Sequence, residues 1–343
     1  MKIAVLYSPF DKLSNKEVEQ DLKEMGISVH GALRKAGYEP LLVDIDKVGF
    51  QGIQELQPDV VFNVCERLHG DSTYEPQIAS LLEMTGLKIT GSSGATLSVC
   101  NNKIMTKAMA QRHGILTPKH AVFFNRDQPF KDGLSFPVLV KPAAMHNSIG
   151  IFKDSLAHTE EDMRKKIARI LYQYRQPVLV EEYIPGRDIE ATIIGNNGSA
   201  KALPLVEVFY PKLKDQSQQF FSYESKWSKG KQESGYYRTA ENIPPEMHKE
   251  LGAMAKKYYK LFNIRDYGRI DFRIGEDGKI YLLEATANPG LSHGDSTIVA
   301  AEAAGMAHTA FILNIFLTAS QRHGLFNRQE VSLMLQERIT QSS

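Results

Sequence analysis

The sequence predicts an α/β fold that begins with a doubly wound parallel sheet and continues into α+β domains. Two observations carry this prediction. Strand-like and helix-like segments alternate over residues 1–92, and a strand–helix–strand order implies parallel pairing with helices on both faces of the sheet. Residues 266–290 instead contain two strand-like segments joined by a tight turn, which implies antiparallel pairing.

The composition is that of a soluble globular protein with two or three domains. The chain has 343 residues, of which 42% are hydrophobic and 24% charged, and its formal net charge is +1. This balance indicates neither a nucleic-acid partner nor a membrane partner. Two cysteines are too few for a disulfide framework, and neither a signal peptide nor a membrane span is recognised. We therefore expect a cytoplasmic protein.

Residues 1–93 are expected to form the first domain. The helix after the first strand carries apolar residues at helical spacing, and Gly37 is placed to end it. No glycine-rich dinucleotide fingerprint follows the first strand. Ligands of such sheets bind beyond the carboxyl ends of the strands, so the polar loop 63–71 is a candidate substrate contact, or else an ordinary solvated loop. Strands are predicted at 2–7, 40–44, 60–64 and 87–89, and helices at 15–35, 53–56 and 77–84.

Residues 94–185 are expected to form a second domain, in which a buried strand ends in Lys141. A lysine directly after such a strand needs a partner, and an anionic ligand is one candidate. The small polar loop 143–150 follows, and its backbone N–H groups are suited to covering phosphates, although such loops are also simple turns. The predicted helices span 94–114 and 159–174, and the predicted strands span 120–124, 136–142 and 177–183.

Residues 186–325 are expected to form a third domain, followed by a polar tail at 326–343. Residues 215–238 are rich in polar residues and glycine and are predicted to be a mobile lid that carries Lys226 and the single tryptophan, Trp227. A strand is predicted at 188–195, and helices are predicted at 245–262, 295–304 and 309–318.

The hairpin at 266–290 places Asp271 and Glu284 on paired strands. Apolar and charged residues alternate from Arg269 to Ile274, which is the period of a strand with two different faces. Two carboxylates on one face repel each other unless a cation lies between them, and hard oxygen ligands suit Mg²⁺. From the hairpin alone, two solvated surface carboxylates are an equally good interpretation.

Seven segments in one order resemble the ATP-grasp superfamily, specifically its D-alanine–D-alanine ligase-like carboxylate–amine ligases. Among them are VLVKPAAMHNSIGI, which contains Lys141, and LLEATANPGL, which contains Glu284. The resemblance covers roughly residues 58–320. The seven segments are residues 61–93, 101–115, 138–151, 178–195, 222–227, 267–272 and 282–291.

This resemblance implies an ATP-grasp fold and a ligase that depends on ATP and Mg²⁺, with Mn²⁺ as a possible substitute. A small-molecule carboxylate is phosphorylated by ATP, and an amine then attacks the acyl phosphate, so that an amide, ADP and phosphate are formed. A homodimer is expected. The implied ATP contacts are Lys103 and Lys141 at the phosphates, Glu181, Glu182, Tyr183 and Ile184 at the adenine, Asp188 at the ribose and Lys226 at the γ-phosphate. The implied catalytic groups are Arg269 and the N–H of Gly290 at the oxyanion and Ser148 in the phosphate loop, and the implied metal ligands are Asp271 and Glu284.

The departures from the family pattern concern the metal and the substrates. Thr286 stands where the family has an asparagine metal ligand, and Asn288 is a candidate replacement. Of the Glu-Gly-Ser-Ser typical of the phosphate loop only Ser148 is kept, and Trp227 replaces a lid tyrosine. The glutamate that holds the first substrate's ammonium has no clear counterpart; Glu17, Asp71 and Glu75 are the candidates.

Asp295 aligns with the serine that binds the second substrate's carboxylate, or Ser296 does after a slip of one residue. Because an aspartate repels a carboxylate, we infer an amine other than D-alanine. Two alternatives stay open at this point. One is a D-alanine–D-alanine ligase of peptidoglycan synthesis, and the other, favoured by Thr286, is a non-catalytic nucleotide-binding module.

Overall fold

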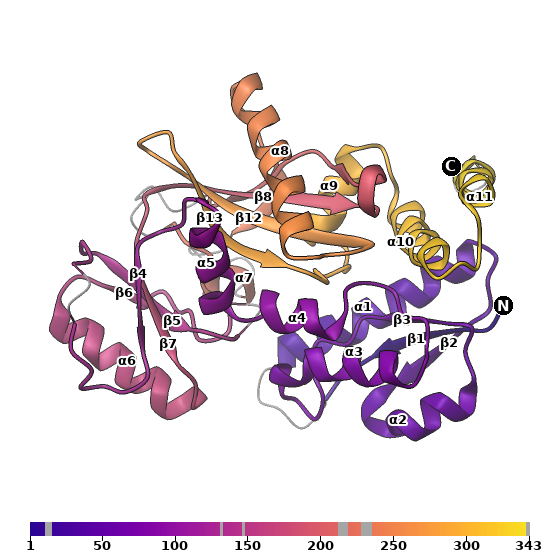
Figure 1. Ribbon diagram of the computed structural model, residues 1–343, viewed down its shortest axis with the longest axis horizontal. Helices are drawn as coiled ribbons and strands as arrows, with labels where there is room; N and C mark the ends of the chain where they lie inside the picture. The colour runs from indigo at the N-terminus through magenta and orange to yellow at the C-terminus, as the bar shows by residue number, and fades with distance from the viewer. Residues whose placement is uncertain (11–15, 131–132, 146–147, 212–218, 228–234, 341–343) are drawn as a thin grey trace.

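A three-stranded parallel sheet forms the N-terminal part of the protein. The computed structural model describes residues 1–10, 16–130, 133–145, 148–211, 219–227 and 235–340. Alternate residues of the first strand face different helices, which confirms the doubly wound parallel arrangement. The sheet order is β2–β1–β3, with β1 at Ile3–Tyr7, β2 at Pro40–Asp44 and β3 at Val60–Asn63; α1 (Lys16–Lys35) covers one face, and α2 (Ile45–Leu56) and α3 (Glu75–Met84) cover the other (Figure 1).

Two expectations for this region need correction. The strand expected at 87–89 is reduced to one bridge between Val61 and Ile89. The helix expected over 94–114 is broken into α4 (Gly94–Cys100) and α5 (Lys103–Arg112). The break occurs because Asn102 has extended backbone angles and its side chain accepts the N–H groups that open α5. This cap makes Lys103 the first residue of a helix, which the sequence did not lead us to expect.

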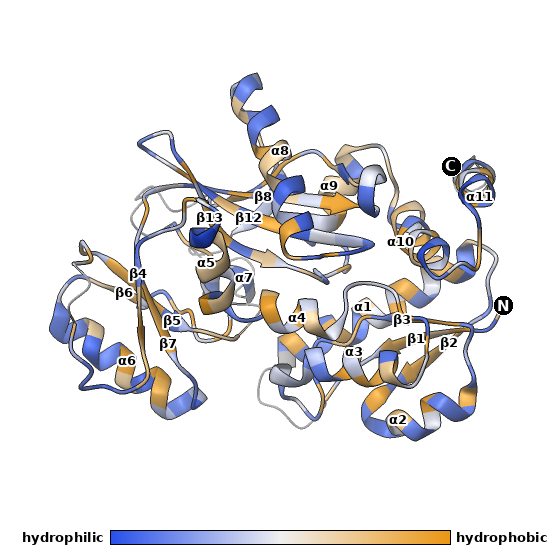
Figure 2. Cartoon of the chain, viewed as in Figure 1, coloured by the Kyte–Doolittle hydropathy of each residue, from blue (hydrophilic) through white to orange (hydrophobic). Residues whose placement is uncertain are grey.

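An antiparallel sheet with one covering helix forms the central part. Even-numbered residues of its two middle strands pack against α6, as Val140 and Val180 do, while the odd-numbered residues face away from that helix. Figure 2 shows blue and orange alternating along α6, as expected for a helix with one buried face. The sheet order is β4–β7–β5–β6, with β4 at His120–Phe123, β5 at Val138–Pro142, β6 at Leu156–Ala157 and β7 at Val178–Glu182; α6 spans Glu160–Tyr174.

A larger antiparallel sheet forms the C-terminal part, with α8 (Pro245–Leu261) on one face and α9 (Ser296–Ala303) and α10 (His308–Arg322) on the other (Figure 1). The predicted hairpin is present as its last two strands. The order is β11–β10–β8–β12–β13, with β8 at Gly186–Ile194, β10 at Val206–Phe209, β11 at Tyr236–Thr239, β12 at Tyr267–Gly275 and β13 at Ile280–Thr286; the short β9 (Lys201–Ala202) pairs with β8. Two 3₁₀ turns, η1 (Ser72–Tyr74) and η2 (Asn197–Ser199), complete the described elements before the tail.

The described parts of the lid and the tail contain regular structure that the sequence analysis did not expect. The segment 215–238 includes the short helix α7 (Tyr223–Trp227) and most of β11; residues 215–218 and 228–234 lie outside the described residues. The polar tail contains α11 (Arg328–Thr340), whose Val331 is buried in the cluster that includes α10. Among the described residues no single helix is both long and apolar enough to cross a bilayer; α9 and α10 reach that standard only as a pair, bent by 101°.

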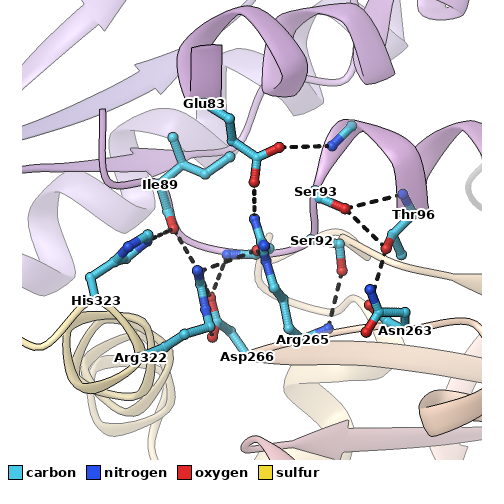
Figure 3. Close-up of polar contacts among 12 residues, drawn as sticks. Glu83, Ile89, Ser92, Ser93, Thr96, Asn263, Arg265, Asp266, Arg322 and His323 are labelled. Carbon is cyan, nitrogen blue, oxygen red and sulfur yellow. Dashed lines mark hydrogen bonds and ion pairs between the residues drawn. The ribbon is translucent and has the colours of Figure 1, made fainter. Parts of the chain in front are cut away.

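Asp266 connects the N-terminal part to the C-terminal part. Its side chain is fully buried and accepts hydrogen bonds from the N–H of Gly91 at 2.8 Å, from Asn196 Nδ2 at 2.8 Å and from Arg322 Nε and Nη2 at 2.9 and 2.7 Å. Arg322 also donates to the carbonyl of Ile89 at 2.8 Å. These bonds join the segment after β3 to β12 and α10 (Figure 3). One buried carboxylate therefore joins three segments of the two parts.

A second set of bonds runs beside this one (Figure 3). Arg265 forms an ion pair with Glu83 on α3 and donates through Nε to the carbonyl of Gly91 at 2.9 Å. Its own N–H donates to the hydroxyl of Ser92 at 3.2 Å. Arg265 and Asp266, which are adjacent in the loop before β12, thus both bind the N-terminal part.

We predict that Asp266→Asn lowers the free energy of unfolding by about 3–5 kcal/mol, because Arg322 would keep its position without a buried counter-charge. Thermal unfolding followed by circular dichroism measures this. Asp277→Asn is the matched control, because Asp277 is exposed in the β12–β13 turn. Equal midpoints for the two variants would contradict the role assigned to Asp266.

Candidate functional site

Two adjoining cavities lie where the three parts meet, and the first gathers most of the residues expected to bind ATP. Ser148, Phe221, Arg269 and Glu284 line both cavities, so the two are contiguous. Of the eight expected ATP contacts, Lys226 lines the second cavity instead. The other seven line the first: Lys103, Lys141, Glu181, Glu182, Tyr183, Ile184 and Asp188.

Strand alternation explains how the central sheet contributes to this cavity. Lys141 pairs with Leu179 across β5 and β7, and Glu181 follows Leu179 by two residues, so both charged side chains lie on one face of the sheet. The residues between them face α6 and form the core. The lysine at the end of a buried strand therefore has a carboxylate partner within the protein, in addition to any ligand.

Glu181 forms a buried ion cluster with two lysines. It pairs with Lys141 and with Lys107 Nζ at 2.7 Å, and Lys107 also donates to Thr117 Oγ1 at 2.7 Å. Burial alone would raise the pKa of Glu181, but the charges of Lys107 and Lys141 outweigh it and lower the pKa to about 2. The Glu181 carboxylate thus stays ionised and holds Lys141 at the cavity wall, so any contact with adenine is left to the backbone.

Lys103 bridges the phosphate loop and the hairpin. Its Nζ donates to the carbonyl of Met145 at 2.7 Å and lies 3.2 Å from Glu284 Oε2, while its N–H donates to the carbonyl of Ala143 at 3.0 Å. The side chain is almost fully buried. Lys103 is therefore positioned by contacts from both sides of the cavity; His146 and Asn147 of the same loop lie outside the described residues.

Three carboxylates and one arginine lie side by side on the C-terminal sheet. Asp271 is opposite Glu284 on β13 and opposite Glu190 on β8. Arg269 donates to Asp271 Oδ1 and Oδ2 at 2.7 and 2.8 Å, and its Nε lies 3.2 Å from Glu190. Burial raises the pKa of Asp271, which Arg269 opposes and Glu284 reinforces. Burial also raises the pKa of Glu190, to about 8.

The pair Asp271 and Glu284 fits a partial Mg²⁺ site. Among the described residues no three acidic, histidine or cysteine side chains are arranged to hold a metal ion by themselves. Mg²⁺ is commonly held by one or two carboxylates together with substrate phosphates, which is the donor set that this cavity offers. Asn288 lines the second cavity, and its Oδ1 already accepts the N–H of Ser92 at 2.9 Å. Thr286 lines the second cavity.

The second cavity is acidic. Asp21 comes from α1, Glu66 from the loop after β3, Glu75 from α3 and Asp295 from the residue before α9. Gly290 also lines it, and a side chain at that position would bring a Cβ within 2.5 Å of Asp295 Oδ2. Glycine therefore lets its own backbone and Asp295 share this wall of the cavity.

Four of the expected substrate residues line neither cavity. Asp71 caps η1, and Glu17 is exposed at the start of α1. Trp227 packs beside Tyr223, with the ring centroids 6.4 Å apart, and the Nζ of Lys226 lies 5.0 Å from the Trp227 ring centroid. Ser296 is fully buried, with its Oγ 3.3 Å from Arg269 Nη1. Ser296 thus helps to hold the guanidinium of Arg269 in place and does not line either cavity.

Sequence reasoning missed several charged residues of the site, among them Asp21, Glu66, Lys107 and Glu190, and three of these four carry a simple signal. Asp21 is one helical turn after Glu17, and Lys107 is one turn after Lys103. Glu190 follows Asp188 by two residues in a strand, so both occupy one face. Glu66 lies in a loop and carries no such signal.

Burial and neighbouring acids raise the pKa of two acids in the second cavity. Burial raises the pKa of Asp21 to about 6, with a further contribution from Asp295 and opposition from Lys226. Burial and the charge of Glu66 raise the pKa of Glu75 to about 8, against the hydrogen bond from Asn101. Glu75 is therefore the acid of this cavity that favours its protonated form near pH 7.

Residues 110–317 match the family model described as "D-ala D-ala ligase C-terminus", which is more than half of the chain. The chain belongs to this family. The D-alanine--D-alanine ligase of Aquifex aeolicus is 31% identical to this family member over 293 residues, which cover 85% of this chain and 93% of that protein. The D-alanine--D-alanine ligase of Bordetella petrii is 29% identical over 322 residues, which cover 93% and 92% respectively.

The fold of this family member matches a crystal structure of the D-alanine--D-alanine ligase from Bacillus anthracis complexed with ATP. The TM-score is 0.74, the match covers 95% of this chain and 99% of the other, and the two are 19% identical. The ATP-grasp fold predicted from the sequence is thereby confirmed. Together with the family relationship, this confirms that the protein is an enzyme, an ATP-dependent ligase that joins a carboxylate to an amine.

We predict that Glu75→Gln becomes more stable relative to the wild type as the pH rises from about 5 to 8. The pKa of Glu75 is raised to about 8 in the folded protein, so folding retains a proton that the unfolded chain releases near pH 4.5, and this stabilisation is lost as the pH rises. Glutamine has no such loss. Thermal midpoints across this pH range measure the effect, with the exposed Glu246→Gln as control. Parallel pH profiles for wild type and Glu75→Gln would refute it.

Proposed function

We propose that the ligase binds ATP and Mg²⁺ in the first cavity, and that an amine other than D-alanine reacts from the second. The observation that supports this most is the shared wall of the two cavities, formed by Arg269, Glu284 and Ser148. A lysine-lined cavity suits phosphates, and an acidic cavity suits an amine. The acyl group would pass between them at this wall.

In the proposed first step, a substrate carboxylate oxygen attacks the γ-phosphorus of ATP, and ADP leaves. Lys103 and Lys141 would contact the phosphates, and both are already held in place at the cavity wall. Asp271 and Glu284 would hold Mg²⁺, or Mn²⁺ in its place, and the bound ion would neutralise charge on the phosphates. Positioning and charge stabilisation are the main demands of phosphoryl transfer, and these residues supply both.

In the proposed second step, the amine attacks the acyl phosphate and an amide forms as phosphate leaves. The tetrahedral oxyanion needs donors that are fixed beforehand, and Arg269 and the N–H of Gly290 are the candidates. Asp271, Glu190 and Ser296 fix the guanidinium of Arg269. Little reorganisation is therefore needed during the reaction.

The phosphate loop and the lid are already joined, which supports exclusion of water from the acyl phosphate. Ser148 Oγ donates to the carbonyl of Phe221 at 2.8 Å, and the N–H of Tyr223 donates to the carbonyl of Ile151 at 2.7 Å. These bonds bring α7, with Lys226, over the site. Lys226 lines the second cavity, so we assign it to the boundary between phosphate and amine.

The two alternatives have less support. An acidic second cavity with Asp295 on its wall is a poor site for the carboxylate of an acceptor D-alanine. A non-catalytic module is disfavoured because Lys103, Lys141, Asp271 and Glu284 all line one cavity. The homodimer and the cytoplasmic location stay predictions from the sequence.

We predict that Glu284→Gln lowers the rate of ADP release at least roughly 100-fold, because a metal ligand and the partner of Lys103 lose their charge. A coupled assay for ADP measures the rate, and Glu276→Gln, exposed in the turn of the same hairpin, is the control. Unchanged turnover in Glu284→Gln would remove Glu284 from the proposed metal site.

We predict that the fluorescence of Trp227 changes when ATP and Mg²⁺ bind. Trp227 is the single tryptophan, and it lies on α7, partly buried against the cluster that includes α10, so movement of α7 alters its surroundings. A fluorescence titration measures the change, and calorimetry shows independently that ATP binds. A flat fluorescence titration with binding shown by calorimetry would rule out closure of α7.

A further inference from the structure

Arg273 is a charged residue of the first cavity that the proposed reaction does not use. It follows Asp271 by two residues on β12, so both side chains lie on one face of the sheet, and its partner across β8 is Asp188. It is 3% exposed and lines the cavity beside Tyr183, Ile184 and Asp188. A buried cation therefore lies at the end of the cavity that is proposed to hold adenine and ribose.

The guanidinium of Arg273 joins three separate segments. Its Nη1 lies 2.7 Å from Asp188 Oδ1 on β8, and its Nε donates to the carbonyl of Ile184 at 2.8 Å. Its Nη2 donates to the carbonyl of Gln219, in the lid, and to the hydroxyl of Tyr183, both at 2.9 Å. Because the donors of a guanidinium point in fixed directions, this one side chain sets the relative positions of its partners.

Tyr183 reinforces this arrangement. Its hydroxyl accepts from Arg273 and itself donates to the carbonyl of Gln219 at 3.1 Å. Its ring centroid lies 5.3 Å from the Arg273 guanidinium carbon and 6.2 Å from the ring centroid of Phe220. Gln219 and Phe220 of the lid are therefore held at the nucleotide end of the cavity.

The two carboxylate oxygens of Asp188 have different surroundings. Arg273 occupies Oδ1, whereas Oδ2 lies 3.5 Å from the hydroxyl of Tyr210, which is a long contact. An ion pair with a planar guanidinium fixes the plane of a carboxylate as well as its charge. Oδ2 is therefore the oxygen with capacity to accept a further hydrogen bond, in an orientation that Arg273 sets.

A neighbouring arginine on the other face of the same sheet provides a comparison. Arg187 precedes Asp188 on β8, and it pairs with Glu207 and donates to the carbonyl of Glu241 at 2.7 Å. Neither Arg187 nor Glu207 lines either of the two cavities. Arg273 differs from this structural ion pair because most of its partners line the first cavity.

We propose that Arg273 is a positioning residue that gives the site its preference for a nucleotide with an intact ribose. It acts through Asp188, whose Oδ2 accepts a ribose hydroxyl in the orientation that the guanidinium imposes. Removal of Arg273 leaves this largely buried carboxylate without its counter-charge, so the ribose hydroxyl loses a fixed acceptor. This inference rests on the proposed function, in which ATP occupies the first cavity.

The test measures the binding of ADP, 2′-deoxy-ADP and 3′-deoxy-ADP to the full chain by calorimetry in the presence of Mg²⁺. We expect the wild type to bind ADP at least about tenfold more tightly than at least one of the deoxy analogues, because each analogue lacks a hydroxyl that could bond to a carboxylate. In Arg273→Met this ratio of affinities should fall below about threefold.

Matched variants separate positioning from a general loss of structure. Arg187→Met removes an arginine ion pair from the other face of the sheet, so it should keep the wild-type ratio. Arg273→Lys keeps the charge without the planar fork, so its ratio should fall between the two, and it decides the test if circular dichroism shows that Arg273→Met does not fold. Asp188→Asn should lower the ratio as far as Arg273→Met, and the double variant should lower it no further.

The outcomes distinguish the inference from the proposed function. A wild-type ratio in every Arg273 variant that folds, or an equal fall in Arg187→Met, would overturn the inference. Equal affinities of the wild type for all three nucleotides would also overturn it and would leave the proposed ATP cavity intact. A wild-type chain that does not bind ADP would contradict the proposed function and the inference together.

Discussion

The buried contact between Asp266 and Arg322 determines where the catalytic groups meet. Both cavities have walls from more than one part of the chain, and the second has α1 and α3 on one side and the β12–β13 hairpin on the other. Asp266 lies one residue before β12 and binds Gly91 of the N-terminal part. Together with the bonds of Arg265, this contact holds the acidic groups of α1 and α3 opposite Arg269.

Where the sequence predicted site residues correctly, strand and helix periods assigned their side chains to faces; Asp21, Lys107 and Glu190 lie on such elements too, but their signal was missed. The hairpin pair Asp271 and Glu284 and the parallel sheet followed from such periods. What failed depends on local side-chain bonding or on distant packing. The Asn102 cap divides a helix that was predicted to be continuous. The tail predicted to be polar contains a helix whose Val331 is buried against the cluster that includes α10. The acidic cavity draws on segments far apart in sequence.

The two cavities differ in how their charged side chains are paired. In the first cavity Glu181 is matched by Lys107 and Lys141, so its charge is set before any ligand arrives. In the second cavity acids face one another and are partly protonated. The paired charges of the first cavity favour a fixed geometry for phosphate. The neighbouring acids of the second cavity favour a cation.

The two-residue break between α4 and α5 connects the two cavities. Asn101 bonds to Glu75, Asn102 caps α5, and Lys103 binds the phosphate loop and Glu284. Three consecutive residues thus contact the second cavity, the start of α5 and the first cavity. A bonded chain of three residues therefore connects Glu75 at the second cavity with Lys103 at the first.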